Sequence, residues 1–291
     1  MIPRFALARP TSIAEAFGAW EAAGGDAAWY AGGTELLQVM KMGLARVGTL
    51  IDLKRLPELR GLSVDGDGAL VIGAGTTHRE IERSELVRRE LPALAALETH
   101  VANLRVRNQG TLGGNVAFAE PHSDPATFLL ACGASVALVS PRGERTLPMA
   151  DFVVGPFATA RDADEILVSI RIPRARAGEG RGYAKAKFRE RPAVSVGLAL
   201  HVEGARAVAA TVAIGSMTDT PVLVPEAAAA FGGARADETG IDEAARHARP
   251  HLEALDAADD LDGSADYKRH LAGVLLRRAA RDAVAEARAR A

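Results

Sequence analysis

Two pairs of adjacent glycines constrain this chain more than any other feature of its sequence. Gly32 and Gly33 lie in AGGTEL, and Gly113 and Gly114 lie in QGTLGGNVAFAEPHSD. Glycine loses more conformational freedom on folding than any other residue, so a pair in an apolar region needs a compensating interaction. Because glycine has no side chain, neighbouring amide N–H groups can converge on a phosphate. Both segments are therefore candidate phosphate-binding turns, with a tight turn lacking any ligand as the alternative for either one alone.

The bulk composition is that of a soluble globular protein. The chain has 291 residues, of which 48% are hydrophobic and 25% are charged, and this length favours two modest domains. Its 35 basic and 37 acidic side chains nearly cancel, so we expect no nucleic-acid partner. No window approaches 18 consecutive apolar residues and no signal peptide is recognisable, so we expect no membrane span and a cytoplasmic location.

The single cysteine, Cys132, excludes a disulfide framework and a cysteine-rich metal site within this chain. His247 and His251 are four residues apart, but Pro250 lies between them, which favours a solvated helix end over a metal pair. We therefore predict no metal site. Walker, HExxH and GxSxG motifs are absent from the sequence, so no catalytic residue is predicted from them.

The first part of the chain predicts helices and strands in alternation. Ser12 and Glu15 have the spacing of a capping box, and the helix that follows should end at Gly24 and Gly25. Apolar runs and turn residues then predict strands over 26–30, 49–54, 69–75, 134–140 and 165–172. Helical spacing is found over 34–43 and, broken near Pro92, over 76–103.

A domain boundary is predicted within 172–182, where Pro, Gly and Arg replace apolar periodicity. The resulting domains are 1–175 and 178–291. The second domain predicts three successive antiparallel strands over 183–190, 194–204 and 207–218, followed by helices over 241–257 and from Ser264 onward. The Ala- and Arg-rich end, 277–291, is expected to fray into solvent.

One further motif is the strand-to-helix turn VIGAGTTHRE. Gly73 and Gly75 match the first two glycines of a dinucleotide fingerprint, but His78 occupies the third position, so the fingerprint fails. Asp124 precedes Pro125 and is predicted to be the N-cap of a helix beginning PATFLLA, a role that leaves a ribose contact open. Asn115 is predicted either to cap locally or to hold its loop to a ligand.

Three segments together, AGGTELLQVMKMG, GAGTTHREIE and VRNQGTLGGNVAFAEPHSDPA, resemble the flavin-binding subunit of the molybdenum hydroxylases. This family includes the medium subunit of carbon monoxide dehydrogenase and the flavin domain of xanthine dehydrogenase. GYAKAKFRERPAVSVGLAL and DYKRHLAGVLLRRAA extend the resemblance over essentially the whole chain. It implies an α+β fold: an FAD-binding domain of two α/β subdomains, of the PCMH or vanillyl-alcohol-oxidase type, and a smaller C-terminal domain with a three-stranded antiparallel sheet and helices.

The resemblance also implies an FAD site. The first paired-glycine segment would cradle the pyrophosphate, the second would form a further loop, and Val101 would lie along the cofactor. Asp124 would bind the adenosine side, and Tyr183 and Lys185 would lie near the isoalloxazine ring. The candidate cofactor-binding residues are Ala31, Gly32, Gly33, Thr34, Glu35, Leu36, Val101, Thr111, Leu112, Gly113, Gly114, Asn115, Asp124, Tyr183 and Lys185. The chain departs from the family pattern at Glu35 and in EPHSDPAT.

The function implied is electron transfer by an FAD-dependent oxidoreductase. FAD would accept electrons from iron–sulfur clusters and pass them to NAD, a quinone or another acceptor. Because one cysteine cannot hold an iron–sulfur cluster, the clusters and the molybdenum cofactor would belong to partner chains. The expected partners are a small iron–sulfur subunit and a large molybdenum subunit in a dimer of heterotrimers. A self-contained FAD-dependent oxidoreductase and a non-catalytic nucleotide-binding scaffold are the alternatives.

Overall fold

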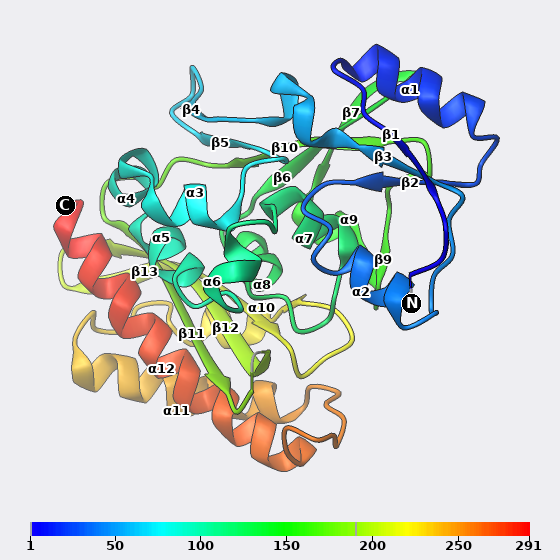
Figure 1. Cartoon of the computed structure of the whole chain (residues 1–291). Coiled ribbons are helices and arrows are strands. Elements are labelled where there is room, and N and C mark those ends of the chain that lie inside the picture. Colours follow the sequence, from blue (N-terminus) through cyan, green and yellow to red (C-terminus); the bar gives the residue numbers. More distant parts are fainter. Residues whose placement is uncertain (1, 190) are drawn as a thin grey trace.

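A computed structural model describes residues 2–189 and 191–291 (Figure 1). Its N-terminal subdomain is a three-stranded parallel sheet in the order β1-β3-β2, formed by β1 (Ala6–Ala8), β2 (Ala27–Tyr30) and β3 (Thr49–Asp52). Two helices accompany it, α1 (Ile13–Ala22) and α2 (Leu36–Lys41). Ser12 caps α1 as predicted, but the Glu15 carboxylate accepts hydrogen bonds from Thr11 rather than from the Ser12 amide. The capping box is therefore only half formed.

The second subdomain contains a five-stranded antiparallel sheet in the order β4-β5-β10-β6-β7. Its strands are β4 (Leu62–Val64), β5 (Leu70–Gly73), β6 (Ser135–Ser140), β7 (Gly143–Pro148) and β10 (Ile166–Ile172). The predicted helical region 76–103 forms three helices, α3 (His78–Arg83), α4 (Glu85–Glu90) and α5 (Pro92–Glu98). Three more helices lie between α5 and β6 in the sequence: α6 (Leu104–Arg107), α7 (Leu112–Phe118) and α8 (Asp124–Ala131).

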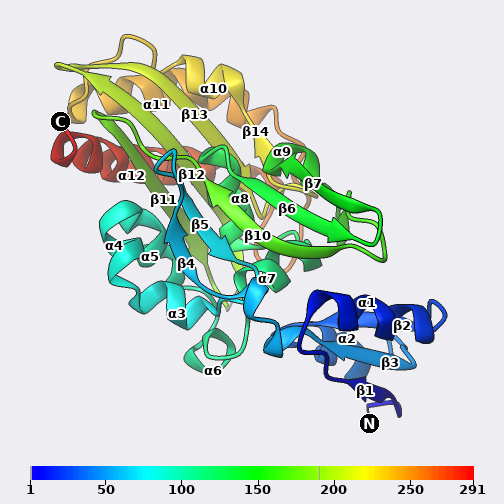
Figure 2. The ribbon, with the colours of Figure 1, turned by 90° about the horizontal axis from the view of Figure 1, so that it is seen from above.

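Short elements complete this subdomain. They are the 3-10 turns η1 (Leu53–Arg55) and η2 (Pro57–Leu59), the helix α9 (Met149–Phe152) and the two-stranded sheet of β8 (Val153–Gly155) and β9 (Ala158–Thr159). Seen from above, the five-stranded sheet lies between the N-terminal subdomain and the C-terminal elements (Figure 2).

The C-terminal elements begin with an antiparallel sheet in the order β11-β12-β13-β14. Its strands are β11 (Glu179–Lys187), β12 (Pro192–Glu203), β13 (Arg206–Gly215) and β14 (Val222–Leu223). The three expected strands are present, and β14 adds a short fourth strand that the sequence pattern did not predict. The predicted end of the first strand at Glu190 lies outside the described residues. Helices α10 (Pro225–Ala229), α11 (Glu238–Glu253) and α12 (Ala265–Ala289) follow.

The C-terminal helix does not fray, contrary to the sequence-based expectation. α12 continues to Ala289 because its alanines pack against two glycines of β11. A Cβ atom at Gly180 would collide with the carbonyl oxygen of Ala283, and one at Gly182 would collide with that of Ala279. Only a glycine strand lets the helix come this close, and the apolar contact therefore holds the helix end to the sheet.

Helix α8 connects the five-stranded sheet to the C-terminal sheet. All of its residues are buried, and the Thr127 hydroxyl lies 3.0 Å from that of Ser195 on β12. Ser123, not Asp124, is the N-cap, since its Oγ accepts from the amide of Ala126 while Asp124 begins the helix. The predicted cap was therefore displaced by one residue. Among the described residues, no helix is long and apolar enough to cross a membrane.

Candidate cofactor-binding site

A cleft of about 730 Å³ lies where the N-terminal subdomain meets the five-stranded subdomain, with Arg191 and Pro192 of the C-terminal elements at its edge. Its volume suits a ligand the size of a dinucleotide. Both paired-glycine segments line the cleft, and so do Val101 and Asp124. Of the candidate residues predicted from the sequence, Leu112, Tyr183 and Lys185 do not line it.

The first paired-glycine segment presents a row of unpaired backbone donors. Within the part of the chain that the structure describes, the amide N–H groups of residues 32–36 donate to no protein acceptor. Gly33 has a φ of +74°, a conformation that residues with a side chain rarely adopt. All five residues line the cleft. Unpaired amides at a concave, partly enclosed surface call for an acceptor, and phosphate oxygens meet that need.

The second paired-glycine segment differs from the expected loop. It forms the first turn of α7, with Thr111 as N-cap. The amides of Leu112 and Gly113 donate to the carbonyls of Thr76 and Ala74, and that of Gly114 donates to Thr111 Oγ1. Its amides are therefore used within the chain. A Cβ atom at Gly113 would collide with Ala74, so this glycine is required for packing between α7 and the end of β5.

The two segments touch each other directly. A Cβ atom at Gly32 would collide with the carbonyl oxygen of Gln109 and would lie 2.7 Å from Gly110 Cα. This contact explains one glycine of the first pair by backbone approach alone. It also brings the unpaired amides of residues 32–36 next to the start of α7, so the two motifs form one site rather than two.

Asp124 is brought together with Tyr183 and Lys185, but only Asp124 of the three lines the cleft. The Asp124 carboxylate accepts hydrogen bonds from the Tyr183 hydroxyl at 2.5 Å and from Lys185 Nζ at 2.7 Å. Burial, followed by the Asp124 charge, raises the pKa of Tyr183 well above its usual range. Burial lowers the pKa of Lys185, and the Asp124 carboxylate opposes that shift.

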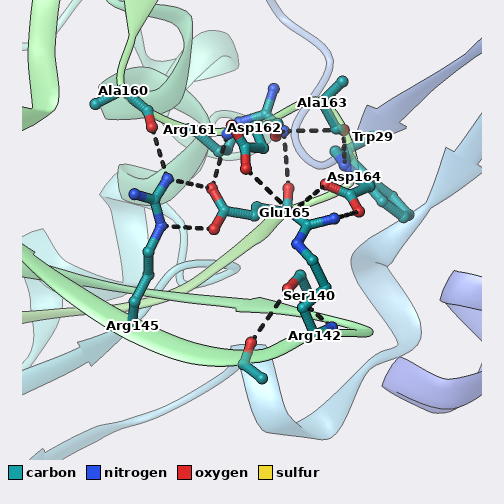
Figure 3. A network of polar contacts seen from close by, with 11 residues as sticks. Trp29, Ser140, Arg142, Arg145, Ala160, Arg161, Asp162, Ala163, Asp164 and Glu165 are labelled. Atoms are coloured by element: carbon teal, nitrogen blue, oxygen red, sulfur yellow. Dashed lines mark hydrogen bonds and ion pairs between the residues drawn. The ribbon is translucent and has the colours of Figure 1, made fainter.

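A polar network joins several of the cleft-lining residues, among them Trp29, Arg161 and Glu165 (Figure 3). Trp29 on β2 donates from Nε1 to the carbonyl oxygen of Ala163 at 3.0 Å, which ties the N-terminal subdomain to the loop before β10. Arg161 donates to the carbonyl oxygens of residues 162, 163 and 165 from one guanidinium nitrogen. Arg145 holds the Glu165 carboxylate with two hydrogen bonds and lowers the pKa of that carboxyl.

Several cleft residues were missed in the sequence-based prediction. Arg191 bridges Glu35 at 3.1 Å and Glu120 at 2.7 Å, which joins the two glycine segments from the outside. Lys54 lies 2.8 Å from Asp52 and donates to the carbonyl oxygen of Ala31. His78 was not predicted as a cofactor-binding residue, yet it lines the cleft. Arg191 is far in sequence from Glu35 and Glu120, so no local pattern could predict its contacts. Nor does any local pattern indicate that Lys54 and His78 line the cleft.

His122 lines the cleft and forms a hydrogen bond to Glu120 through Nδ1. Its ligand atoms also lie within 4.8 Å of those of Asp260 and Asp262. Those carboxylates already have cationic partners, because Asp260 pairs with Lys268 and Asp262 with Arg189. The arrangement therefore contains neutralised acids rather than an evident cation site.

The residues present fit a flavin dinucleotide. The cleft combines apolar and aromatic walls, including Trp20 and Phe118, with unpaired amides concentrated at one segment. This is the usual composition of a cofactor site, in which apolar surfaces hold rings and a few polar groups fix orientation. Among the described residues, the five amides of residues 32–36 are unpaired donors of the kind that phosphate oxygens accept from.

Comparison with known proteins identifies the family. Residues 3–175 match the model of the FAD binding domain in molybdopterin dehydrogenase, and residues 183–283 match the CO dehydrogenase flavoprotein C-terminal domain. The carbon monoxide dehydrogenase medium chain of Hydrogenophaga pseudoflava is 33% identical over 95% of this chain and 96% of its own length. The nicotine 6-hydroxylase medium subunit of Paenarthrobacter nicotinovorans is 32% identical over the same shares.

Solved structures agree with these matches. A carbon monoxide dehydrogenase chain from Hydrogenophaga pseudoflava superimposes with a TM-score of 0.91 at 33% identity, covering 98% of this chain and 99% of that chain. A chain of quinoline 2-oxidoreductase from Pseudomonas putida 86 superimposes with a TM-score of 0.91 at 29% identity, covering 99% of both chains. The predicted resemblance, α+β fold, oxidoreductase class and FAD cofactor are confirmed. This chain therefore belongs to the family of FAD-binding medium subunits of the molybdopterin dehydrogenases, with a C-terminal domain of the CO dehydrogenase flavoprotein type.

Proposed function

We propose that this chain carries FAD between an electron donor and an electron acceptor within a molybdenum-containing hydroxylase or dehydrogenase. Electrons would arrive from iron–sulfur clusters on a partner chain and leave to NAD, a quinone or another acceptor. The observation that carries the proposal is the row of unpaired amides over residues 32–36 in a cleft of dinucleotide size. FAD, when bound, supplies the ability to accept and release electrons that no side chain here provides.

We assign the residues that line the cleft to parts of the cofactor. Residues 31–36 hold the diphosphate, with Thr34 contributing its hydroxyl. Val101, Thr111 and Gly114 line the path of the cofactor, where a side chain at position 114 would fill space beside Ala31. The side-chain Oδ1 of Asn115 accepts a hydrogen bond from Ser123. Its side-chain nitrogen Nδ2 has no acceptor among the described residues and would donate to the ligand.

Three further candidates act indirectly in this assignment. Leu112 is fully buried and anchors α7 in the core. Tyr183 and Lys185 hold Asp124 in place from β11, so they fix the wall that Asp124 contributes to the cleft. The role predicted for this pair beside the isoalloxazine ring would require that the two side chains leave Asp124.

The remaining cofactors belong on partner chains in this proposal. An iron–sulfur cluster is held by four cysteine thiolates, and this chain has only Cys132, which is buried. We infer a small iron–sulfur subunit and a large molybdenum subunit, assembled as a dimer of heterotrimers in the cytoplasm. Two similar proteins are themselves named medium chain or medium subunit, which supports an assembly of several chains.

Absorbance and affinity measurements test the assignment. The purified chain, reconstituted with FAD, should be yellow with a band near roughly 450 nm. Thr34→Glu places a negative charge beside the expected diphosphate and should abolish FAD retention, whereas the matched Thr34→Gln variant should retain FAD. Equal FAD content in the two variants would contradict the placement of the diphosphate at residues 32–36.

Copurification tests the partners. A tagged chain expressed in its native source should bring down two other chains, one with iron–sulfur absorbance and one with molybdenum. Recovery of a single chain that oxidises an organic substrate by itself would contradict the proposed subunit role and would favour a self-contained flavoenzyme.

A further inference from the structure

His78 and Glu98 form a buried pair at the cofactor cleft. Nδ1 of His78 lies 2.7 Å from Oε2 of Glu98, and the two side chains are 3% and 0% exposed. The other carboxylate oxygen, Oε1, is buried without a hydrogen-bond partner. In residues 2–189 and 191–291, no hydrogen bond reaches Nε2 of His78 either, although this residue lines the cleft. A buried polar nitrogen without a protein partner at a ligand cleft points to a ligand acceptor or donor.

The unpaired edge of the ring faces the junction of the two glycine segments. Cδ2 of His78, which is bonded to Nε2, lies 3.2 Å from where a Cβ atom of Gly110 would stand. Oγ1 of Thr34 lies 3.4 Å from the same point, and Gly32 packs directly against Gly110. Nε2 is thus on the side of the unpaired amides of residues 32–36, while Nδ1 is turned away toward α5.

The hydrogen-bonding geometry of the ring decides what Nε2 can offer the cleft. An imidazole whose Nδ1 accepts a hydrogen bond carries its hydrogen on Nε2, and a ring with hydrogens on both nitrogens also donates from Nε2. The Glu98 carboxyl, 2.7 Å from Nδ1, is compatible with either arrangement and fixes the orientation of the ring.

Other charged groups near the pair already have partners. Lys185 from β11 interacts electrostatically with Glu98, but its ammonium is hydrogen-bonded to Asp124 from α8 and to the carbonyl oxygen of His100. Arg107 from α6 pairs with Glu82 of α3. These charged groups therefore have partners other than Nε2 of His78.

We propose that His78, oriented by Glu98, donates a hydrogen bond from Nε2 to the diphosphate of the bound flavin dinucleotide. The second glycine segment uses its amides internally, so the diphosphate lacks donors on that side, and the imidazole supplies one. Because diphosphate oxygens accept hydrogen bonds, the ring carries a hydrogen on Nε2 in the proposed complex. This inference rests on the proposed function, because it presupposes FAD in the cleft.

The test is the dissociation constant of FAD, measured by flavin fluorescence on the reconstituted chain. His78→Leu/Glu98→Met replaces the whole pair with apolar groups, which is often neutral for folding. It should weaken FAD binding about tenfold or more. His201→Gln, on β12 and outside the cleft lining, should keep the wild-type affinity.

The outcomes separate the two proposals. Tight FAD binding by the wild type with an equal dissociation constant in the double variant would overturn the role of His78 and leave the proposed function intact. No FAD binding by the wild type would overturn the proposed function, and the role of His78 with it. If the double variant is not folded by circular dichroism, His78→Gln, which keeps a polar partner for Glu98, must weaken FAD binding instead, and an unchanged affinity would overturn the role of His78.

Discussion

Lys185 Nζ lies 2.7 Å from the carboxylate of Asp124, 61 positions earlier in the chain, and thereby joins β11 of the C-terminal sheet to the start of α8. Both side chains are nearly buried, at 9% and 6% exposure. Breaking such a pair by removing one partner leaves an uncompensated charge in the interior. The pair therefore links the stability of the domain contact to the wall of the cofactor cleft.

We predict that Asp124→Ala lowers the free energy of unfolding by about 3–5 kcal/mol, because the Lys185 ammonium and the Tyr183 hydroxyl both lose their acceptor. Urea unfolding measures this directly. The double variant Asp124→Ala/Lys185→Met should recover part of the loss, since no buried charge is left unpaired. Removal of an exposed helix pair through Arg249→Ala is the control and should have little effect. Additive losses for Asp124 and Lys185 would contradict direct coupling.

The two glycines of the second pair are predicted to differ in their importance for folding. A Cβ atom at Gly113 would meet the backbone and side chain of Ala74, and neither can move without shifting β5. Gly113→Val should therefore lower the free energy of unfolding by at least about 1–3 kcal/mol. The variant should lose FAD as a consequence. At Gly114 the nearest atom is Thr111 Oγ1 at 2.8 Å, a side chain that can rotate at the cost of an N-cap, about 1 kcal/mol.

Thermal unfolding and FAD content of Gly113→Val and Gly114→Val check this difference. Gly114→Val should unfold near the wild-type temperature but hold less FAD, because the added side chain enters the cleft near Ala31. Wild-type stability in Gly113→Val would show that α7 can move away from β5. In that case the glycine would be needed only for the ligand.

The sequence predicted those features of the fold and the site that are determined by neighbouring residues in the chain. The AGGTEL turn, the boundaries of α1 and the first three strands of the C-terminal sheet follow from short-range patterns, and they are present in the structure. The pairing of His78 with Glu98 and of Asp124 with Lys185 depends on how helices pack, which no local spacing encodes. The same is true of Gly180 and Gly182, whose contact with α12 reversed the expectation that this helix frays.

The paired glycines illustrate both outcomes within one motif. Their spacing indicated unusual backbone contact, and the structure contains that contact in both segments. The sequence could not distinguish amides left open, as over residues 32–36, from amides satisfied within a helix, as at Leu112 and Gly113. That distinction is made by Thr76 and Ala74, whose carbonyl oxygens accept from the amides of Leu112 and Gly113 and lie more than 30 positions before them in the chain.

Arg191 is predicted to slow the release of FAD. Its guanidinium lies between Glu35 and Glu120 at the edge of the cleft and neutralises two carboxylates that would otherwise repel a diphosphate. Arg191→Ala should increase the dissociation rate of FAD several-fold at low salt and less at high salt, since the pair is half exposed. Stopped-flow flavin fluorescence measures the rate, and Arg189→Ala, which affects the pair with Asp262 instead, is the matched control. Equal rates for the two variants would remove Arg191 from the site.

The buried thiol of Cys132 should make stability fall at alkaline pH. Burial raises the pKa of Cys132 from 9.0 to about 12. Between these values the unfolded chain loses the thiol proton and the folded chain keeps it, so unfolding releases a proton and becomes easier as pH rises. The contribution of this residue is a loss of about 1.4 kcal/mol per pH unit from pH 9 toward pH 12, with none below pH 9. Other groups titrate in this range, so the quantity to measure is the difference in urea unfolding free energy between the wild type and Cys132→Ala. That difference should shrink as pH rises from 8 to 10.5, and a constant difference would mean that solvent reaches the thiol in the folded chain.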